Sequence, residues 1–220
     1  MARSCRSRSR PQHHKRKCRV WREVSRYASV GDNPQPDGSL TLTEHHQIIG
    51  ELAFPYKAPI AYRALLELGV EALPAVRAGL RHDNPDVRLH CCRILDRYLS
   101  PDTLSDLIGM LTDEDERVRC SALHTLACDR CKKGTCRPEK ADVLPKAMKL
   151  LQCDPDAHVR AMAIEVVGQF VHTDALAVAA ISAAQQADEN PTVRKKAGWH
   201  MPGGPIHRRT KPRLSSISSS

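Results

Sequence analysis

Apolar residues recur with helical spacing over residues 57–201, and one five-residue pattern occurs four times among them. The pattern is Asn or Asp, two variable residues, then Val and Arg, with the Val at positions 87, 118, 159 and 193. An Asn or Asp at an N-cap accepts a hydrogen bond from a free backbone N–H, and Pro suits the next position because it has no N–H to lose. Each copy therefore predicts the start of a helix.

The residues four and eight positions after each Val lie on the same helical face as the Val. The residue four positions on is small in every copy, so the backbone of another helix is expected to pass close to it. The residue eight positions on is larger and fills the space beside it. We expect the following positions to be core: Cys91, Ala122, Ala163 and Ala197, then Leu95, Leu126, Val167 and Met201.

A second apolar segment precedes each copy, at residues 73–80, 104–111, 144–151 and, less regularly, 176–183. Each unit therefore reads as helix, tight turn, helix. The Val-to-Val spacings are 31, 41 and 34 residues. Repeats of this length are typical of solenoids, in which stacking between units buries the apolar face that no single unit can bury alone.

The recurring Asx-x-x-Val-Arg, followed by small and aliphatic residues, resembles the HEAT repeat in the short form also found in phycobilisome-lyase-like proteins. The resemblance covers roughly residues 57–201. It implies an all-α, right-handed α–α solenoid of the ARM type, with about four to five HEAT-like helix pairs and disordered basic termini. It fixes no activity, because this repeat serves adaptors, lyases, a hydroxylase and DNA-repair glycosylases.

The resemblance also implies a role for the Arg that follows each Val. In HEAT repeats this Arg commonly forms a ladder with the Asp of a neighbouring turn, and we favour such a structural role here over a functional one. The Arg residues and the helix-start residues of the predicted ladder are Arg88, Arg119, Arg160, Arg194, Asn84, Asp115, Asp156 and Asn190.

Three segments are expected along the chain. Residues 1–44 form a basic disordered arm and linker, 45–201 form the solenoid, and 202–220 form a basic, Ser-rich disordered tail. A degenerate first unit around 57–68 would close one end of the stack. At the other end, Lys195 and Lys196 would give the last repeat the polar outer face that a terminal repeat needs.

Charge is distributed unevenly over these segments. Residues 1–29 carry a net charge of +9 and residues 201–220 carry +4, so the remainder carries −4. A segment as charged as 1–29 does not fold alone, and it is either an arm that binds phosphate backbones, a solvated tail or a targeting peptide. The candidate phosphate-binding residues are Arg6, Arg8, Arg10, Lys15, Arg16, Lys17 and Arg19.

The second repeat spacing is longer because of a nine-residue Cys-rich insert within 128–138. Cys128 and Cys131 form a Cys-x2-Cys pair, Cys136 follows after Gly134, and His124 lies one helical turn before Cys128. These four side chains predict a structural zinc site of Cys3His type with no open coordination position. A loop with free thiols and a redox-active Cys128–Cys131 pair are the alternatives.

His124 aligns with Arg93 and Glu165 of the neighbouring units, so its face is polar there and a core role is disfavoured. Apart from the insert, no metal or cofactor site stands out. The longest apolar run, 175–184, is too short to span a bilayer, and no apolar segment follows the basic N-terminus. With nine cysteines, the chain is expected to be cytoplasmic and not associated with membranes.

The function expected from these features is a non-catalytic scaffold or adaptor that binds a protein or peptide partner on the solenoid surface. We expect the chain to be a monomer. A nucleic-acid-associated protein that uses the basic N-terminal arm is the alternative. A HEAT-type lyase or other enzyme is disfavoured, because the sequence has no His-Glu dipeptide, phosphate loop, nucleophile elbow or paired carboxylates placed for acid–base catalysis, and no catalytic residue is assigned.

Overall fold

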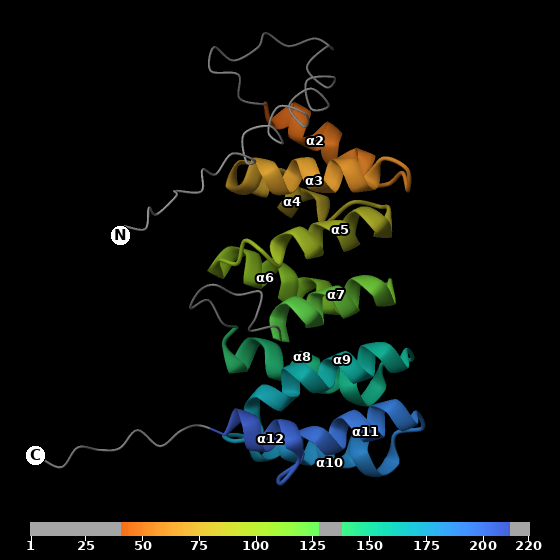
Figure 1. Cartoon of the computed structure of the whole chain (residues 1–220), viewed down its shortest axis with the longest axis vertical. Helices are drawn as coiled ribbons and strands as arrows, with labels where there is room; N and C mark the ends of the chain where they lie inside the picture. Colours follow the sequence, from red (N-terminus) through yellow and green to blue (C-terminus); the bar gives the residue numbers. More distant parts are fainter. Residues whose placement is uncertain (1–40, 128–137, 212–220) are drawn as a thin grey trace, which may run out of the picture. The chain divides into compact units, whose positions relative to one another are not determined.

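The computed structural model describes residues 41–127 and 138–211, and the regular structure in these two ranges is entirely helical (Figure 1). This agrees with the all-α prediction. The chain divides into two compact units between Ala75 and Val76. The N-terminal arm, the Cys-rich insert from Cys128 and the end of the C-terminal tail lie outside the described residues.

The first unit contains α2 (Leu42–Glu51), α3 (Ala58–Leu68), η1 (Gly69–Ala72) and the first residues of α4 (Leu73–Gly79). A capping box begins α2, in which the Thr41 side chain accepts from the Glu44 N–H and the Glu44 carboxylate accepts from the Thr41 N–H. The expected linker therefore already ends at this helix, a few residues before the predicted domain boundary at 45. Gly69, with φ of 65°, ends α3 in a conformation that disfavours side chains.

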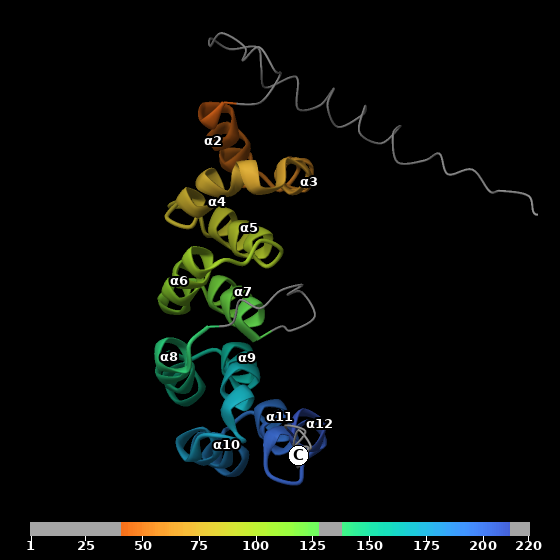
Figure 2. The same cartoon turned by 90° about the vertical axis from the view of Figure 1, so that its left-hand side faces the viewer.

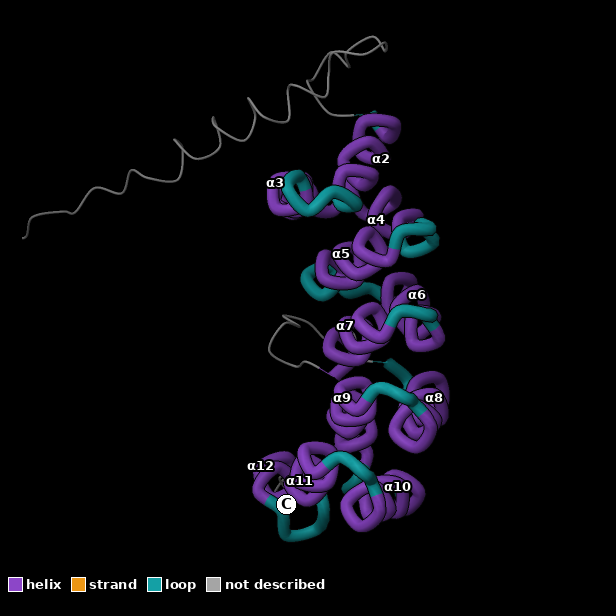
Figure 3. Tube along the Cα trace, turned by 90° about the vertical axis from the view of Figure 1, so that its right-hand side faces the viewer, coloured by secondary structure: helices purple, strands orange, loops and turns teal. Residues whose placement is uncertain are grey.

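The second unit is a series of helix pairs. Two layers are visible in Figures 2 and 3, with α6, α8 and α10 in one and α5, α7, α9 and α11 in the other. We call the second set the second helices. The helices of this unit after α4 are α5 (Pro85–Leu95), α6 (Pro101–Gly109), η2 (Met110–Thr112), α7 (Glu116–Ala127), α8 (Lys140–Cys153), α9 (Ala157–Val167), η3 (Gly168–Phe170), α10 (Ala175–Ala187), α11 (Pro191–His200) and α12 (Pro205–Thr210).

A helix begins directly after the Asn or Asp of each repeated pattern. Asn84, Asp156 and Asn190 are N-caps whose side chains accept a backbone N–H in the first turn. The Asp115 carboxylate likewise accepts the N–H of Arg117 at the start of α7. The four predicted helix starts are therefore confirmed, and each short polar side chain stabilises an otherwise unpaired N–H.

The core of the second unit follows the predicted face. The four repeat Val residues are fully buried, and so are the small residues four positions on, Cys91, Ala122, Ala163 and Ala197. Burial raises the pKa of the Cys91 thiol, as expected for a packed rather than reactive cysteine. Met201 departs from the prediction: it is only half-buried, because α11 ends at His200 and Met201 is its extended C-cap.

The expected disordered tail at 202–220 is wrong for its first part, because residues 205–210 form α12. Gly203 reverses the chain with φ of 85°, and Pro205 at the first helical position favours a new helix. Gly204 lies so close to α11 that a Cβ there would be 2.5 Å from the carbonyl oxygens of Gly198 and Trp199. The two glycines thus return the chain onto α11. The Pro- and Gly-rich composition of the segment instead predicts disorder.

No helix of the described ranges is both long enough and apolar enough to cross a lipid bilayer.

Candidate functional site

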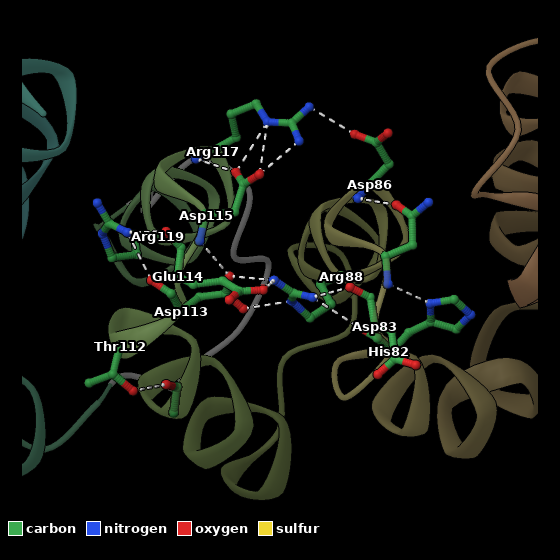
Figure 4. Close-up of polar contacts among 12 residues, drawn as sticks. His82, Asp83, Asp86, Arg88, Thr112, Asp113, Glu114, Asp115, Arg117 and Arg119 are labelled. Atoms are coloured by element: carbon green, nitrogen blue, oxygen red, sulfur yellow. Dashed lines mark hydrogen bonds and ion pairs between the residues drawn. The ribbon is translucent and has the colours of Figure 1, made fainter.

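Three of the four repeat Arg residues join one helix pair to the next through paired hydrogen bonds to a carboxylate, as Figure 4 shows for Arg88. Arg88 donates to both carboxylate oxygens of Asp113 at 2.8 and 2.9 Å. Arg119 does the same to Asp154, and Arg160 to Asp188. Each of these Arg side chains also donates to two backbone carbonyls of the turn before its own helix.

Arg194, the last of the series, donates only to the carbonyls of Asp188 and Glu189 among the described residues. Within the described part of the chain, the side chains of Asn84, Asp115, Asp156 and Asn190 do not accept from the guanidinium groups of the repeat Arg residues. From those Arg residues, their backbone carbonyls accept only the backbone N–H, as expected in the first helical turn. The paired acid lies two residues before the helix start in the last three copies, at Asp113, Asp154 and Asp188.

These three carboxylates were not predicted from the sequence, although a signal for them is present there. Each lies two positions before the Asx residue of a repeat, and each accepts the backbone N–H of that residue as well as the Arg. The side chains of the paired Arg and Asp residues are nearly buried. The ladder therefore holds neighbouring helix pairs in register. Its guanidinium groups already donate to carboxylates and carbonyls of the protein itself.

The exposed side of the second helices carries a different set of residues. Relative to each repeat Val, they lie at one position before, three after and six after, a spacing of four and three that places them on one helical stripe. All of them are exposed or half-buried. This second-helix stripe consists of Asp86, His90 and Arg93 on α5, Arg117, Ser121 and His124 on α7, His158, Met162 and Glu165 on α9, and Thr192, Lys196 and Trp199 on α11.

Neighbouring helices contact one another along the stripe. Arg117 of α7 donates to Asp86 of α5 at 2.8 Å, and Lys196 of α11 lies 2.9 Å from the Glu165 carboxylate of α9. These contacts connect the stripe between α5 and α7 and again between α9 and α11, above the buried row of Val residues. The stripe can present side chains from several helices to one extended ligand.

Glu165 is the most perturbed carboxylate of the stripe. The pKa of Glu165 is lowered to about 2, first by the His200 imidazole and then by the Lys196 ammonium. The Nε2 atom of His200 lies 3.5 Å from Glu165, so this contact is longer than the Lys196 contact. The His200 ring is almost fully buried and lies directly over Gly168, the start of η3.

Only His124 of the predicted zinc ligands belongs to the described residues, and it is exposed on the stripe. Cys128, Cys131 and Cys136 lie outside the described residues, as do the arm residues Arg6 to Arg19. In the described ranges, no three His, Cys, Asp or Glu side chains are grouped to hold a metal ion. The zinc site therefore remains a prediction from the sequence.

Two features of the last helices were not foreseen. Trp199 is 39% exposed, and the Lys195 ammonium lies 5.7 Å from the centre of its ring. The rings of His172 and His207 lie 4.3 Å apart, and His172 contacts the Thr210 hydroxyl at 3.1 Å. Trp199 could have been noticed from its position in the repeat, where it aligns with Arg93, whereas the contacts of α12 depend on the turn at Gly203.

Comparison with known families and structures gives two kinds of match. A family model described as HEAT repeats matches residues 73–149, and a model described as HEAT repeat matches residues 143–173. No curated protein sequence matches the chain.

Among solved structures, the chain is similar to the complex of CpcE and CpcF of phycocyanin lyase from Nostoc sp. PCC7120. The TM-score is 0.54 at 22% sequence identity, over 71% of this chain and 97% of that chain. An engineered protein is also similar, with a TM-score of 0.42 and 14% identity over 82% of this chain and 76% of that one. The first likeness supports the fold alone.

Proposed function

Residues 73–173 of this chain are HEAT repeats, and from this premise we propose that the protein is a non-catalytic scaffold that binds a protein or peptide partner on the second-helix stripe. Repeats of this kind stack to present one long surface rather than a single deep site. The proposal assigns the ladder to stability and the stripe to binding.

The observation that carries the proposal is the contrast between two sets of repeated polar residues. The ladder Arg residues are nearly buried, and their donors are used within the protein. At the sixth position after the repeat Val, by contrast, Arg93 and His124 are exposed on adjacent second helices, and Trp199 is exposed on the last. Exposed polar and aromatic side chains on a rigid support are the usual elements of a protein-binding surface.

The structural neighbour from Nostoc adds support, since its structure is that of a complex of two proteins, CpcE and CpcF. A fold of this type is thus compatible with binding another protein. At 22% identity the likeness transfers neither the lyase activity nor the partner, so we propose only the general use of the surface.

The proposal can be tested by placing a photo-crosslinking amino acid at Arg93 or His124 in the full-length chain expressed in its own cells. Matched control positions are Ser105 and Lys149, which are exposed on α6 and α8, in the other helix layer. We expect the same discrete crosslinked protein from both stripe positions and none from the controls. Equal crosslinking from both layers, or none from the stripe, would contradict the proposal.

The alternative function, nucleic-acid binding through the arm, rests on residues outside the described part of the chain. Deleting residues 1–29 would abolish a steeply salt-dependent affinity if the arm were responsible. A HEAT-type enzyme remains the less favoured reading. A cytoplasmic location is proposed from the nine cysteines, which suit a reducing compartment.

A further inference from the structure

The last helices of the second unit differ in charge from the described helices before them in that unit. The described residues 76–127 and 138–189 contain 17 Asp and Glu against 11 Lys and Arg. Residues 190–211 contain six Lys and Arg and no acid. A polyanion is therefore attracted to this end of the unit more than to the acidic helices described before it.

Four of the six cations are exposed, namely Lys195 on α11, Arg208 and Arg209 on α12, and Lys211 directly after α12. None of these four forms an ion pair with another described residue. The other two are engaged, because Arg194 donates to turn carbonyls and Lys196 pairs with Glu165. The exposed charge is thus available to a ligand.

An aromatic ring lies within this basic region. Trp199 is exposed on α11, one turn after Lys195, whose ammonium lies 5.7 Å from the ring centre. A flat ring beside a cation can receive a stacked base while the cation receives a phosphate. Trp199 is the only Trp in the described ranges, since the other Trp of the chain, Trp21, lies in the arm.

The turn after α11 brings α12 back alongside α11 (Figure 1). The start of α12 lies against the last carbonyls of α11 through Gly204, and Arg208 follows only about 6 Å further along the helix axis. His207 and Thr210 contact His172 and hold α12 in place. The Arg208 and Arg209 side chains remain exposed.

We propose that the surface formed by Lys195, Trp199, Arg208, Arg209 and Lys211 binds single-stranded nucleic acid, with a base stacked on Trp199 and phosphates on the surrounding cations. We call it the α11–α12 surface. It goes beyond the proposed protein-binding function, and it uses none of the arm residues of the alternative function.

The exposed aromatic ring of Trp199 favours a nucleic acid over an acidic peptide as the ligand of the α11–α12 surface. Both ligands would be attracted by the four cations, but only the nucleic acid supplies a planar ring with every repeating unit. A single strand also exposes its bases, which a duplex keeps stacked inside. The expected binding is therefore independent of sequence, dependent on salt and stronger for single strands than for duplexes.

The test uses the full-length chain with Trp21→Phe, so that Trp199 is the single fluorescent Trp. Titration with a 15-residue oligo(dT) or oligo(U) at low salt should quench Trp199 emission, because stacking brings a base against the ring. A polyglutamate peptide of equal charge should leave the emission unchanged. Unchanged emission with the oligonucleotide would overturn the proposal, and so would equal quenching by polyglutamate, which would point to a general polyanion surface.

Binding of a labelled oligonucleotide, followed by anisotropy, identifies the residues. Trp199→Ala should weaken binding by about fivefold to a hundredfold, the loss of one stacked base. Arg208→Ala with Arg209→Ala should lower the slope of log affinity against log salt by about 1.4, the loss of two phosphate contacts. Lys146→Ala with Lys149→Ala, exposed on α8, removes the same charge elsewhere and is the matched control.

Equal losses in the α12 double variant and the α8 control would refute a localised surface. If none of the α11–α12 variants changed the affinity for the oligonucleotide, the binding site would lie elsewhere, for example on the arm, and the proposal would be overturned. Lys195→Ala retains the Trp199 ring and should still weaken binding, which keeps the test informative if Trp199→Ala destabilises the last repeat. The crosslinking test at Arg93 and His124 is independent of these outcomes.

Discussion

The Arg119 guanidinium donates two hydrogen bonds, of 2.8 and 3.0 Å, to the carboxylate of Asp154, 35 positions later in the chain. The side chains are only 10% and 3% exposed, and Asp154 raises the pKa of Arg119. This pair joins α7 to the turn before α9. The Cys-rich insert lies between the two residues in sequence, so this Arg–Asp pair connects the helix pairs that precede and follow the insert.

Arg119→Ala should destabilise the protein strongly, because it leaves the Asp154 carboxylate buried without its cation. The expected loss in unfolding free energy is about 3–5 kcal/mol, to be measured by urea denaturation followed by circular dichroism. Arg117→Ala is the matched control on the same helix, since Arg117 is half-exposed in its pairs with Asp115 and Asp86. It should cost less than about 1 kcal/mol. Similar losses in both variants would argue against a special role for the buried ladder.

Gly168→Ala should be destabilising, although alanine usually favours a helix more than glycine does. A Cβ at this position would lie 2.1 Å from Nδ1 of His200, so the ring has to move and the cost is about 1–3 kcal/mol. Gly109→Ala at the end of α6 is the control, because a Cβ there meets nothing within 4 Å. Thermal melts should show that the control is neutral or more stable by up to about 1 kcal/mol.

The double variant Gly168→Ala with His200→Ala tests the cause of that loss. If the clash with the imidazole is responsible, the second substitution makes the first one nearly harmless, since the space taken by the new methyl is vacated. Additive losses would instead show that the local backbone at position 168 requires glycine, whatever side chain is at position 200.

Glu165 should make acid stability depend on the contact between α9 and α11. Its folded-state pKa is about 2, below the ordinary value of 4.5, because of His200 and then Lys196. The stabilisation is therefore complete above pH 4.5 and is lost as the pH falls from 4.5 towards 2. The difference in unfolding free energy between wild type and Glu165→Gln should shrink over this range.

Glu67→Gln, at an exposed position of α3, is the control for this experiment. Its difference from wild type should vary much less with pH, because exposed carboxylates contribute little to stability. A Glu165→Gln difference that stays constant down to pH 2.5 would show that the carboxylate does not depend on His200 and Lys196.

We propose from the sequence that the insert holds one structural zinc ion through Cys128, Cys131, Cys136 and His124. Mass spectrometry of protein purified without chelator should find about one zinc per chain in the wild type and none after Cys131→Ser. Cys153→Ser, an exposed cysteine at the end of α8, should retain the metal. Metal-free wild-type protein would leave the insert as a loop with free thiols or a redox-active pair.

The fold was largely readable from the sequence because its determinants are local and repeated. An Asx residue at the start of each second helix, and a Val and a small residue on its buried face, occur in every copy, so four weak signals reinforce one another. The end of the last unit was not readable. Residues 202–204 contain a Pro and two glycines, which usually stop a helix. The helix α12 follows because Pro205 favours a helix start and Gly204 approaches α11 closely.

Some features of the candidate site were likewise predicted from the sequence, and others were not. The repeated Arg residues stood out, and their partners Asp113, Asp154 and Asp188 share a position two residues before an Asx. Only the stacking of the helix pairs shows which of these carboxylates each Arg reaches. His124 was placed on a polar face by aligning it with Arg93 and Glu165. The Lys195–Trp199 contact and the proximity of His172 to His207 were not anticipated.

The sequence by itself determined the helix starts, the buried face and the repeat, because these depend on hydrogen bonds and apolar spacing within a few residues. The tertiary structure alone decided which carboxylate each Arg reaches, which polar side chains remain exposed along the second helices, and that α12 returns to α11. Those features depend on the distance between elements far apart in the chain. Such distances are set by how buried side chains pack between helices.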